Sequence, residues 1–297
     1  FCSEFGFQSY PSMNAIRRFA APADKNIAAP VLESHQKNAG GNARIAETMF
    51  RYFRWPETFQ NFVYLSQIQQ GLAIKTAVTH WRSLKPRCMG TLIWQLNDAW
   101  PVCSWASLDH GGDWKLMHYM ARDFYAPLLV TAIPKNGQII LRAVNDDPQP
   151  VELNVTVCTM KLDGTLGDLG TVTATVSDEA VDLMKIPNTA LAPDEMLHFH
   201  WTDTTGLSGS DTYAPRPFKS YNLQAPDLIS NVNGNEITVS ARSLALFVAL
   251  EADVPGRFDA NAFTLLAGER KTVRFMPTNP DDQPTFVRRD LYSATHN

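Results

Sequence analysis

The feature that most constrains how this chain folds is a change in hydrophobic period near residue 126. Upstream of that point, apolar residues recur at helical spacing or in short continuous runs. Downstream of it, apolar and polar residues alternate one by one. Because a period of two places successive side chains on opposite faces of a strand, the downstream part predicts half-buried antiparallel strands. The chain therefore combines an α/β part with a later all-β part.

The all-β part contains two alternating blocks separated by a proline-rich connection over 213–226. In the first block, apolar residues occupy every second position over 151–157 and again over 197–201. In the second block, Asn233-Gly234 is a hairpin turn signal ahead of another alternating strand. We therefore predict two β-sandwich domains, over residues 126–222 and 223–297.

The first 125 residues are typical of a mixed helix and strand region. The chain opens on a short apolar strand, and a long connection over 11–55 follows, which we expect to contain short helices or to carry a function. A helical apolar stripe predicts one long helix over 56–84. A strand over 90–96 and a helix over 114–125 complete this part.

Composition excludes several classes of function. The 297 residues suffice for two or three domains, and a net charge of −4 without a basic stripe argues against a nucleic-acid partner. No apolar run is long enough for a membrane span. The four cysteines form no C-x-x-C pair, so we expect free thiols. His198 and His200 share a strand face without a third ligand at suitable spacing, which favours a packed or exposed pair over a metal site.

Glu4 is the first candidate functional residue. It follows a short apolar start and precedes Phe5-Gly6-Phe7, and the next charged residues are Arg17 and Arg18. A lone carboxylate at the end of a buried strand is typical of an active-site residue that points into a pocket. The simpler interpretation, a solvated surface glutamate, stays open at this point.

The segment from Gly90 to Pro101 is the second candidate. An apolar run is followed by a cluster of aromatic, amide and acidic side chains, namely Trp94, Gln95, Asn97, Asp98 and Trp100. Tryptophan faces suit the C–H face of a sugar ring, and amide and carboxylate groups suit its hydroxyls. The alternative is a core strand with packed tryptophans and an Asn-Asp turn. His35, in the long connection, is a further candidate for substrate binding, although a loop histidine is commonly just solvated.

These motifs resemble the C-terminal part of a β-mannosidase of glycoside hydrolase family 2. The segments that carry the resemblance are Ser3 to Pro11, Gly90 to Leu108, Gly112 to Lys115, His118-Tyr119 and Phe124 to Leu128. The match is specific over residues 1–130 and rests on domain order beyond them. The resemblance implies that residues 1–125 are the C-terminal part of a TIM (β/α)8 barrel, and that the two later domains are immunoglobulin-like.

The same resemblance implies roles for the candidate residues. Glu4 is expected to be the nucleophile at the end of the seventh barrel strand, and Trp94, on the eighth strand, to line the −1 sugar site. Asn97, Asp98, Trp100 and His35 are the other expected substrate-binding residues. The implied reaction is retaining hydrolysis, in which a covalent glycosyl-enzyme forms on one carboxylate while a second carboxyl group acts as acid and then as base. This mechanism needs no cofactor or metal.

The acid/base carboxyl group is not apparent in the chain, since Asp98 and Glu33 do not suit that role. The resemblance places it upstream of Phe1, so we expect the chain to be a fragment whose partner is the N-terminal remainder of the same protein. We do not expect residues 1–297 alone to hydrolyse glycosides. The expected substrate is a β-mannoside or manno-oligosaccharide, and we expect no membrane partner.

Two other functions stay open from the sequence. One is a related family 2 exo-glycosidase, namely a β-galactosidase, β-glucuronidase or exo-β-glucosaminidase. The other is a non-catalytic carbohydrate-binding protein built from sandwiches. For the compartment, an exported or intracellular bacterial enzyme is favoured over a lysosomal one.

Overall fold

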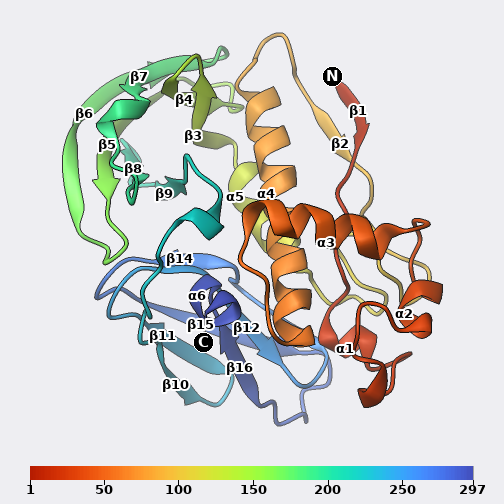
Figure 1. Ribbon diagram of the computed structural model, residues 1–297. Helices are drawn as coiled ribbons and strands as arrows, with labels where there is room; N and C mark the ends of the chain where they lie inside the picture. The colour runs from red at the N-terminus through yellow and green to blue at the C-terminus, as the bar shows by residue number, and fades with distance from the viewer. Residues whose placement is uncertain (297) are drawn as a thin grey trace. The chain divides into compact units, whose positions relative to one another are not determined.

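The computed structural model describes residues 1–296 (Figure 1). The chain forms two compact units, each assembled from separate stretches of sequence. The first unit comprises residues 1–3, 75–92 and 122–222, and the second comprises residues 4–74, 93–121 and 223–297. Helices α4 (Phe59–Arg82) and α5 (Leu116–Phe124) each contribute residues to both units.

The first unit contains two antiparallel sheets around one apolar core. Their strand orders are β3-β4-β7 and β6-β5-β8-β9. The strands are β3 (Leu128–Lys135), β4 (Gln138–Asn145), β5 (Val151–Met160), β6 (Leu166–Val176), β7 (Val181–Pro187), β8 (Met196–Asp203) and β9 (Ser208–Tyr213), with short 3-10 helices at Asn188–Ala190 and Phe218–Ser220. Val155 and Val157 pair with Trp201 and Phe199, and all four lie in the core. The predicted alternation is thus confirmed as a set of inward-facing side chains.

The second unit contains the other pair of sheets, with strand orders β10-β11-β15-β13 and β14-β12-β16. The elements are β10 (Ile229–Asn233), β11 (Glu236–Ser240), β12 (Ala245–Ala252), β13 (Gly256–Phe258), β14 (Phe263–Leu265), β15 (Arg270–Pro277), β16 (Phe286–Arg289) and α6 (Leu291–Thr295). Ile237, Val239, Val273 and Phe275 form the centre of this core. Tyr119, from α5, packs into the same core, so these sheets do not bury their apolar faces on their own.

The remaining elements lie within residues 1–125, on both sides of the division between the two units. They are β1 (Cys2–Phe5), α1 (Met13–Ile16), a 3-10 helix at Pro22–Asp24, α2 (Pro30–Ser34), α3 (Gly41–Tyr52) and β2 (Thr91–Ile93), together with the adjoining parts of α4 and α5. The long connection therefore does contain helices, as expected. The predicted helices at 56–84 and 114–125 appear as α4 and α5 with slightly shorter bounds.

Strands β1 and β2 form a two-stranded sheet (Figure 1). Residues 1–296 contain this strand pair and no closed barrel. Within the same residues all four cysteines are free, and no helix is both long and apolar enough to span a membrane. The Nδ1 atom of His198 lies 3.3 Å from the Thr212 hydroxyl, and no group of three potential metal ligands occurs among the described residues.

Candidate active site

The two strands that carry the candidate motifs lie side by side and run in the same direction. The backbone N–H of Cys2 donates to the Gly90 carbonyl at 3.0 Å, and the N–H of Trp94 donates to the Phe5 carbonyl at 2.8 Å. Since the chain order is the same on both strands, the pairing is parallel. Parallel strands bring their carboxyl ends to one edge, so Glu4 on β1 and Trp94 just after β2 belong to the same edge.

Gly6 allows the close approach of these two segments. A Cβ atom on Gly6 would lie 2.1 Å from the carbonyl oxygen of Trp94 and 3.0 Å from the Trp105 ring. The first distance excludes a Cβ atom because it is to backbone, so the glycine in the aromatic-Gly-aromatic step is required by packing. The Trp94-Gln95 peptide at this contact is cis.

Glu4 and the residues after β2 present their side chains at the surface of residues 1–296. Glu4 is exposed, and its side chain makes no hydrogen bond or ion pair with another described residue. Trp94 is 51% exposed, Trp100 is 38% exposed, and Asn97 is also exposed. Large aromatic side chains are seldom left this open unless something covers them or binds to them.

His35 is brought to the loop after β2 by the long connection. Its ring stacks on Phe19 with a centroid distance of 4.0 Å and lies 5.2 Å from the Trp100 ring. Nδ1 of His35 lies 2.6 Å from the Pro101 carbonyl oxygen. Because a carbonyl only accepts, Nδ1 carries the hydrogen, and Nε2 remains for another partner. The structure thus brings His35 and Trp100 together.

Asp98 is buried and its carboxylate already has several partners. Lys37 approaches Oδ1 at 2.6 Å, Gln95 donates to the same oxygen at 3.1 Å, and the Ser104 hydroxyl donates to Oδ2. These contacts tie the loop after β2 to the long connection. The sequence marked Asp98 as a candidate ligand for substrate but gave no sign of Lys37, because the two residues are distant in the chain.

Neutral amides form a second set of contacts near the start of the chain. Gln8 Nε2 donates to Gln36 Oε1 at 2.7 Å, and Asn38 Nδ2 donates to Gln8 Oε1 at 2.9 Å. Gln36 in turn donates to Asn42 Oδ1 at 2.9 Å. We refer to Gln8, Gln36, Asn38 and Asn42 as the amide network. It holds the segment after β1 against the residues around the start of α3.

Helix α4 supplies buried polar side chains to the same region, which sequence reasoning missed. They are Ser66, Gln67 and Gln70. Ser66 Oγ accepts the N–H of Tyr10 at 3.1 Å, and Gln67 accepts the N–H of Leu116 at 3.0 Å. The signal that could have identified these residues is the run of uncharged polar side chains inside an otherwise apolar helix, since buried amides need fixed partners.

A buried ion pair lies below the loop after β2. Lys115 is fully buried, and its Nζ lies 4.0 Å from Asp109 Oδ1. Asp109 Oδ2 accepts the backbone N–H of Ser12 at 2.6 Å. Burial lowers the pKa of Lys115 and raises the pKa of Asp109, since each charge loses its water. The pair connects the segment after β1 with the start of α5.

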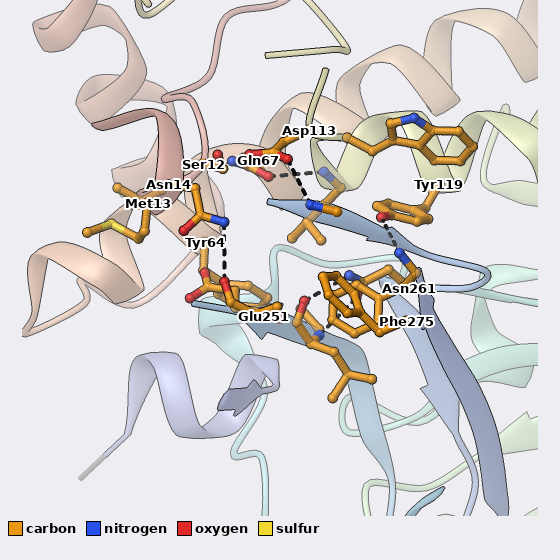
Figure 2. Close-up of a pocket in the computed structure, with 18 of the residues that line it drawn as sticks. Ser12, Met13, Asn14, Tyr64, Gln67, Asp113, Tyr119, Glu251, Asn261 and Phe275 are labelled. Carbon is orange, nitrogen blue, oxygen red and sulfur yellow. Dashed lines mark hydrogen bonds between the residues drawn. The ribbon is translucent and has the colours of Figure 1, made fainter. Parts of the chain in front are cut away.

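The second unit also contains a pocket (Figure 2). Residues from α1, α4, α5 and the C-terminal sheets line it, and none of the predicted site residues does. Asn14 Nδ2 donates to the Ala252 carbonyl at 3.3 Å, and the Tyr119 hydroxyl accepts the N–H of Phe258 at 3.1 Å. Asp113 Oδ1 accepts the N–H of Gly256 at 3.3 Å. We call this pocket the joint, because its polar groups link the helical residues to the C-terminal sheets.

Comparisons with known proteins agree with the motifs. Residues 223–294 match the model of an Ig-fold domain named for mannosidases. The β-mannosidases of Capra hircus and Mus musculus are 27% and 28% identical to this chain over 94% of its length. β-Mannosidase A of Aspergillus oryzae is 28% identical over 93% of it. The chain spans about 35% of the length of each of these relatives.

Solved structures give the same picture. The β-D-mannosidase of Dictyoglomus thermophilum superposes with a TM-score of 0.85 at 25% identity, covering 98% of this chain and 37% of that one. The exo-chitosanase CsxA of Amycolatopsis orientalis superposes at 0.74 with 17% identity, covering 96% of this chain and 41% of that one, which is a likeness of fold. The chain therefore resembles the C-terminal part of β-mannosidases, as its motifs predict.

Proposed function

We propose that the longer protein containing this chain is a retaining exo-glycosidase that removes terminal non-reducing β-D-mannose from β-mannosides and manno-oligosaccharides. The observation that carries the proposal is the parallel pairing of β1 with β2, which brings the end of the Glu4 strand to the end of the Trp94 strand. The similarity to β-mannosidases along nearly the whole chain supports the choice of sugar.

In this proposal, residues 1–125 are the C-terminal part of a (β/α)8 barrel, with β1 as the seventh strand and β2 as the eighth. Residues 126–222 and 223–297 are the two immunoglobulin-like domains that follow it. The other barrel strands, from the N-terminal remainder of the protein, enclose Glu4, which is exposed in residues 1–296 alone. The same strands cover the open faces around Trp94.

The proposed chemistry is a double displacement. Glu4 attacks the anomeric carbon while an acid outside these residues protonates the departing oxygen, and a covalent mannosyl-enzyme forms. The same outside residue then removes a proton from water, which attacks the anomeric carbon and releases Glu4. The two carboxyl groups lie about 5–5.5 Å apart in enzymes of this kind.

The other candidate residues bind the sugar in this proposal. Trp94 lines the −1 subsite with its exposed ring, and Trp100 with His35 forms a second aromatic surface. Asn97 offers hydrogen bonds to hydroxyl groups. Asp98 contributes through Lys37, whose ammonium group it holds beside the same loop.

Substitution of the nucleophile tests the proposal. In the full-length protein, Glu4→Gln is expected to lower kcat on a nitrophenyl β-mannoside by about 10⁴-fold or more, since the covalent route needs a carboxylate. A 2-fluoro mannosyl fluoride is expected to label Glu4, as detected by mass spectrometry of peptides. Glu33→Gln, which removes an exposed carboxylate of the long connection, serves as the matched control and is expected to retain activity.

A Glu4→Gln protein with normal activity would refute the catalytic role of Glu4. A wild-type protein that binds mannosides without hydrolysing them would instead support the carbohydrate-binding alternative. The fold likeness to an exo-chitosanase makes a different sugar specificity the second candidate. A panel of nitrophenyl β-glycosides decides between mannose and another sugar as the substrate, since a β-mannosidase is expected to prefer the mannoside. Preference for the glucosaminide would replace the proposed substrate and keep the proposed mechanism.

A further inference from the structure

Gln70 of helix α4 is a buried side chain with hydrogen bonds to the segments that follow both strands. Its Nε2 donates to the carbonyls of Phe7 at 2.9 Å, Trp105 at 3.1 Å and Ala106 at 3.2 Å. Its Oε1 accepts the hydroxyl of Ser9 at 2.8 Å. The side chain is 0% exposed.

These partners belong to two different segments. Phe7 and Ser9 follow β1, the strand of Glu4, and Trp105 with Ala106 follows β2 and the Trp94 loop. Backbone hydrogen bonds also join these segments, including the N–H of Ser9 to the Ser104 carbonyl at 3.0 Å. One amide side chain from a rigid helix therefore fixes both segments at once.

The geometry points to Gln70 as a positioning residue for the proposed reaction, which sets the distance between the Glu4 strand and the Trp94 strand. This inference rests on the proposed function. An amide suits the task because it offers two N–H donors to carbonyls and an acceptor to a hydroxyl, without a charge. Since Gln70 is fully buried, its loss leaves the Phe7 and Ala106 carbonyls without this donor.

Gln70 has no hydrogen bond with Glu4, and its partners are not the proposed sugar-binding residues. Its loss would therefore act by changing the position of Glu4 relative to Trp94. A misplacement of about 1 Å at a reacting group costs on the order of 10²-fold in rate. We therefore expect the loss of Gln70 to lower kcat while KM changes little. A residue that contributes only to folding would leave the kcat of the folded protein unchanged.

Gln69 offers a matched control on the same helix. It is 3% exposed and its Nε2 donates to the Ile45 carbonyl of α3 at 3.2 Å, away from both strand ends. Gln69→Met therefore breaks a buried amide hydrogen bond of α4 without altering the segments after β1 and β2. Both substitutions are expected to lower the melting temperature.

The experiment compares Gln70→Met with Gln69→Met in the full-length protein, on a nitrophenyl β-mannoside, well below both melting temperatures. The expected result is a loss of about 10- to 100-fold in kcat for Gln70→Met and less than about twofold for Gln69→Met. Equal kcat values for the two variants would overturn the inference. If Glu4→Gln also retains activity, the proposed function has failed instead.

Gln70→Glu provides a second test that does not depend on how well Gln70→Met folds. A carboxylate at this position has no donor for the carbonyls, whereas the neutral acid has one O–H. The ratio of the kcat of Gln70→Glu to that of the wild type is therefore expected to rise as the pH falls. A ratio that stays flat with pH would contradict a positioning role.

Discussion

The two pairs of sheets in this chain differ in what completes their cores. The core of β3–β9 is made of residues from its own strands and loops, such as Val155 and Phe199. The core of β10–β16 includes Tyr119 from α5, and Trp114 packs against it. The first pair of sheets is therefore self-contained, whereas the second shares its core with the helical residues that follow the Trp94 loop.

The difference indicates that the C-terminal sheets are a structural extension of the candidate site. The joint adds hydrogen bonds from Asn14, Tyr119 and Asp113 to the shared core (Figure 2). Asn14 lies in α1, close after the segment that Gln70 holds. Substitutions that destabilise the C-terminal sheets should therefore also destabilise the helical residues near the site. Substitutions in the core of β3–β9 should destabilise those sheets alone.

The largest expected effect comes from large-to-small substitutions in the two cores. Phe199→Ala and Phe275→Ala should each cost about 3–5 kcal/mol in the free energy of unfolding, because each removes a fully buried ring. Amide hydrogen exchange should distinguish the two variants by the elements that it affects. Phe199→Ala should accelerate exchange in β5 and β8, and Phe275→Ala should accelerate it in β15 and also in α5.

Val287→Ala, at a position that is 50% exposed, is the control for these substitutions and should change stability by less than about 0.5 kcal/mol. The comparison between the two cores would fail if Phe275→Ala left the exchange of α5 as it is in the wild type.

A smaller effect is expected for Tyr119→Phe. The substitution leaves the buried N–H of Phe258 without its acceptor, at a cost of about 1–3 kcal/mol at neutral pH. Burial raises the pKa of Tyr119 to about 12, above the usual value of about 10. The neutral phenol therefore stabilises the fold fully below pH about 10, and this contribution is lost as the pH rises toward 12.

The measurement is the unfolding free energy of wild type and Tyr119→Phe between pH 7 and pH 12. The stability difference should be constant up to pH about 10 and should then shrink, since the phenylalanine does not titrate. A difference that stays constant above pH 10 would mean that the hydroxyl is not buried in the shared core.

The smallest effect is expected at Asn14. Asn14→Ala removes two hydrogen bonds to the Ala252 and Val254 carbonyls, at 3.3 and 3.2 Å, and should cost about 1 kcal/mol. Asn14→Asp, which keeps the size but offers no donor, should cost at least as much. Urea denaturation measures both. If Asn14→Asp were as stable as the wild type, the joint would not depend on this donor.

Much of the fold was predictable because periodicity reports burial directly. The helical stripe of 56–84 became α4, and the alternation over 151–157 became β5. Helix α3 was the main element whose bounds the sequence did not predict, because Gly40-Gly41 is typical of a turn. The structure instead has Gly40 in the left-handed region, at φ 69°, immediately before a helix that starts at Gly41. A glycine pair can mark the start of a helix as well as a turn.

The candidate site was predictable only as a set of exposed residue types. Glu4 and Trp94 stand out by sequence because charge and aromatic groups interrupt apolar strands. The residues that hold them do not stand out, because Gln70, Lys37 and Ser104 acquire their roles from partners elsewhere in the chain. Side chains that bond to backbone carbonyls leave no pattern in the sequence of those partners.

The amide network and Gln70 share one property with a practical consequence. They secure the segment behind the Glu4 strand with groups that neither gain nor lose a proton between acid and alkaline conditions. Salt does not weaken such contacts as it weakens exposed ion pairs. These amide contacts would persist across a wide range of buffers, so that a change of activity with pH would come from groups that titrate, such as the reacting carboxyl groups and the buried Lys115–Asp109 pair.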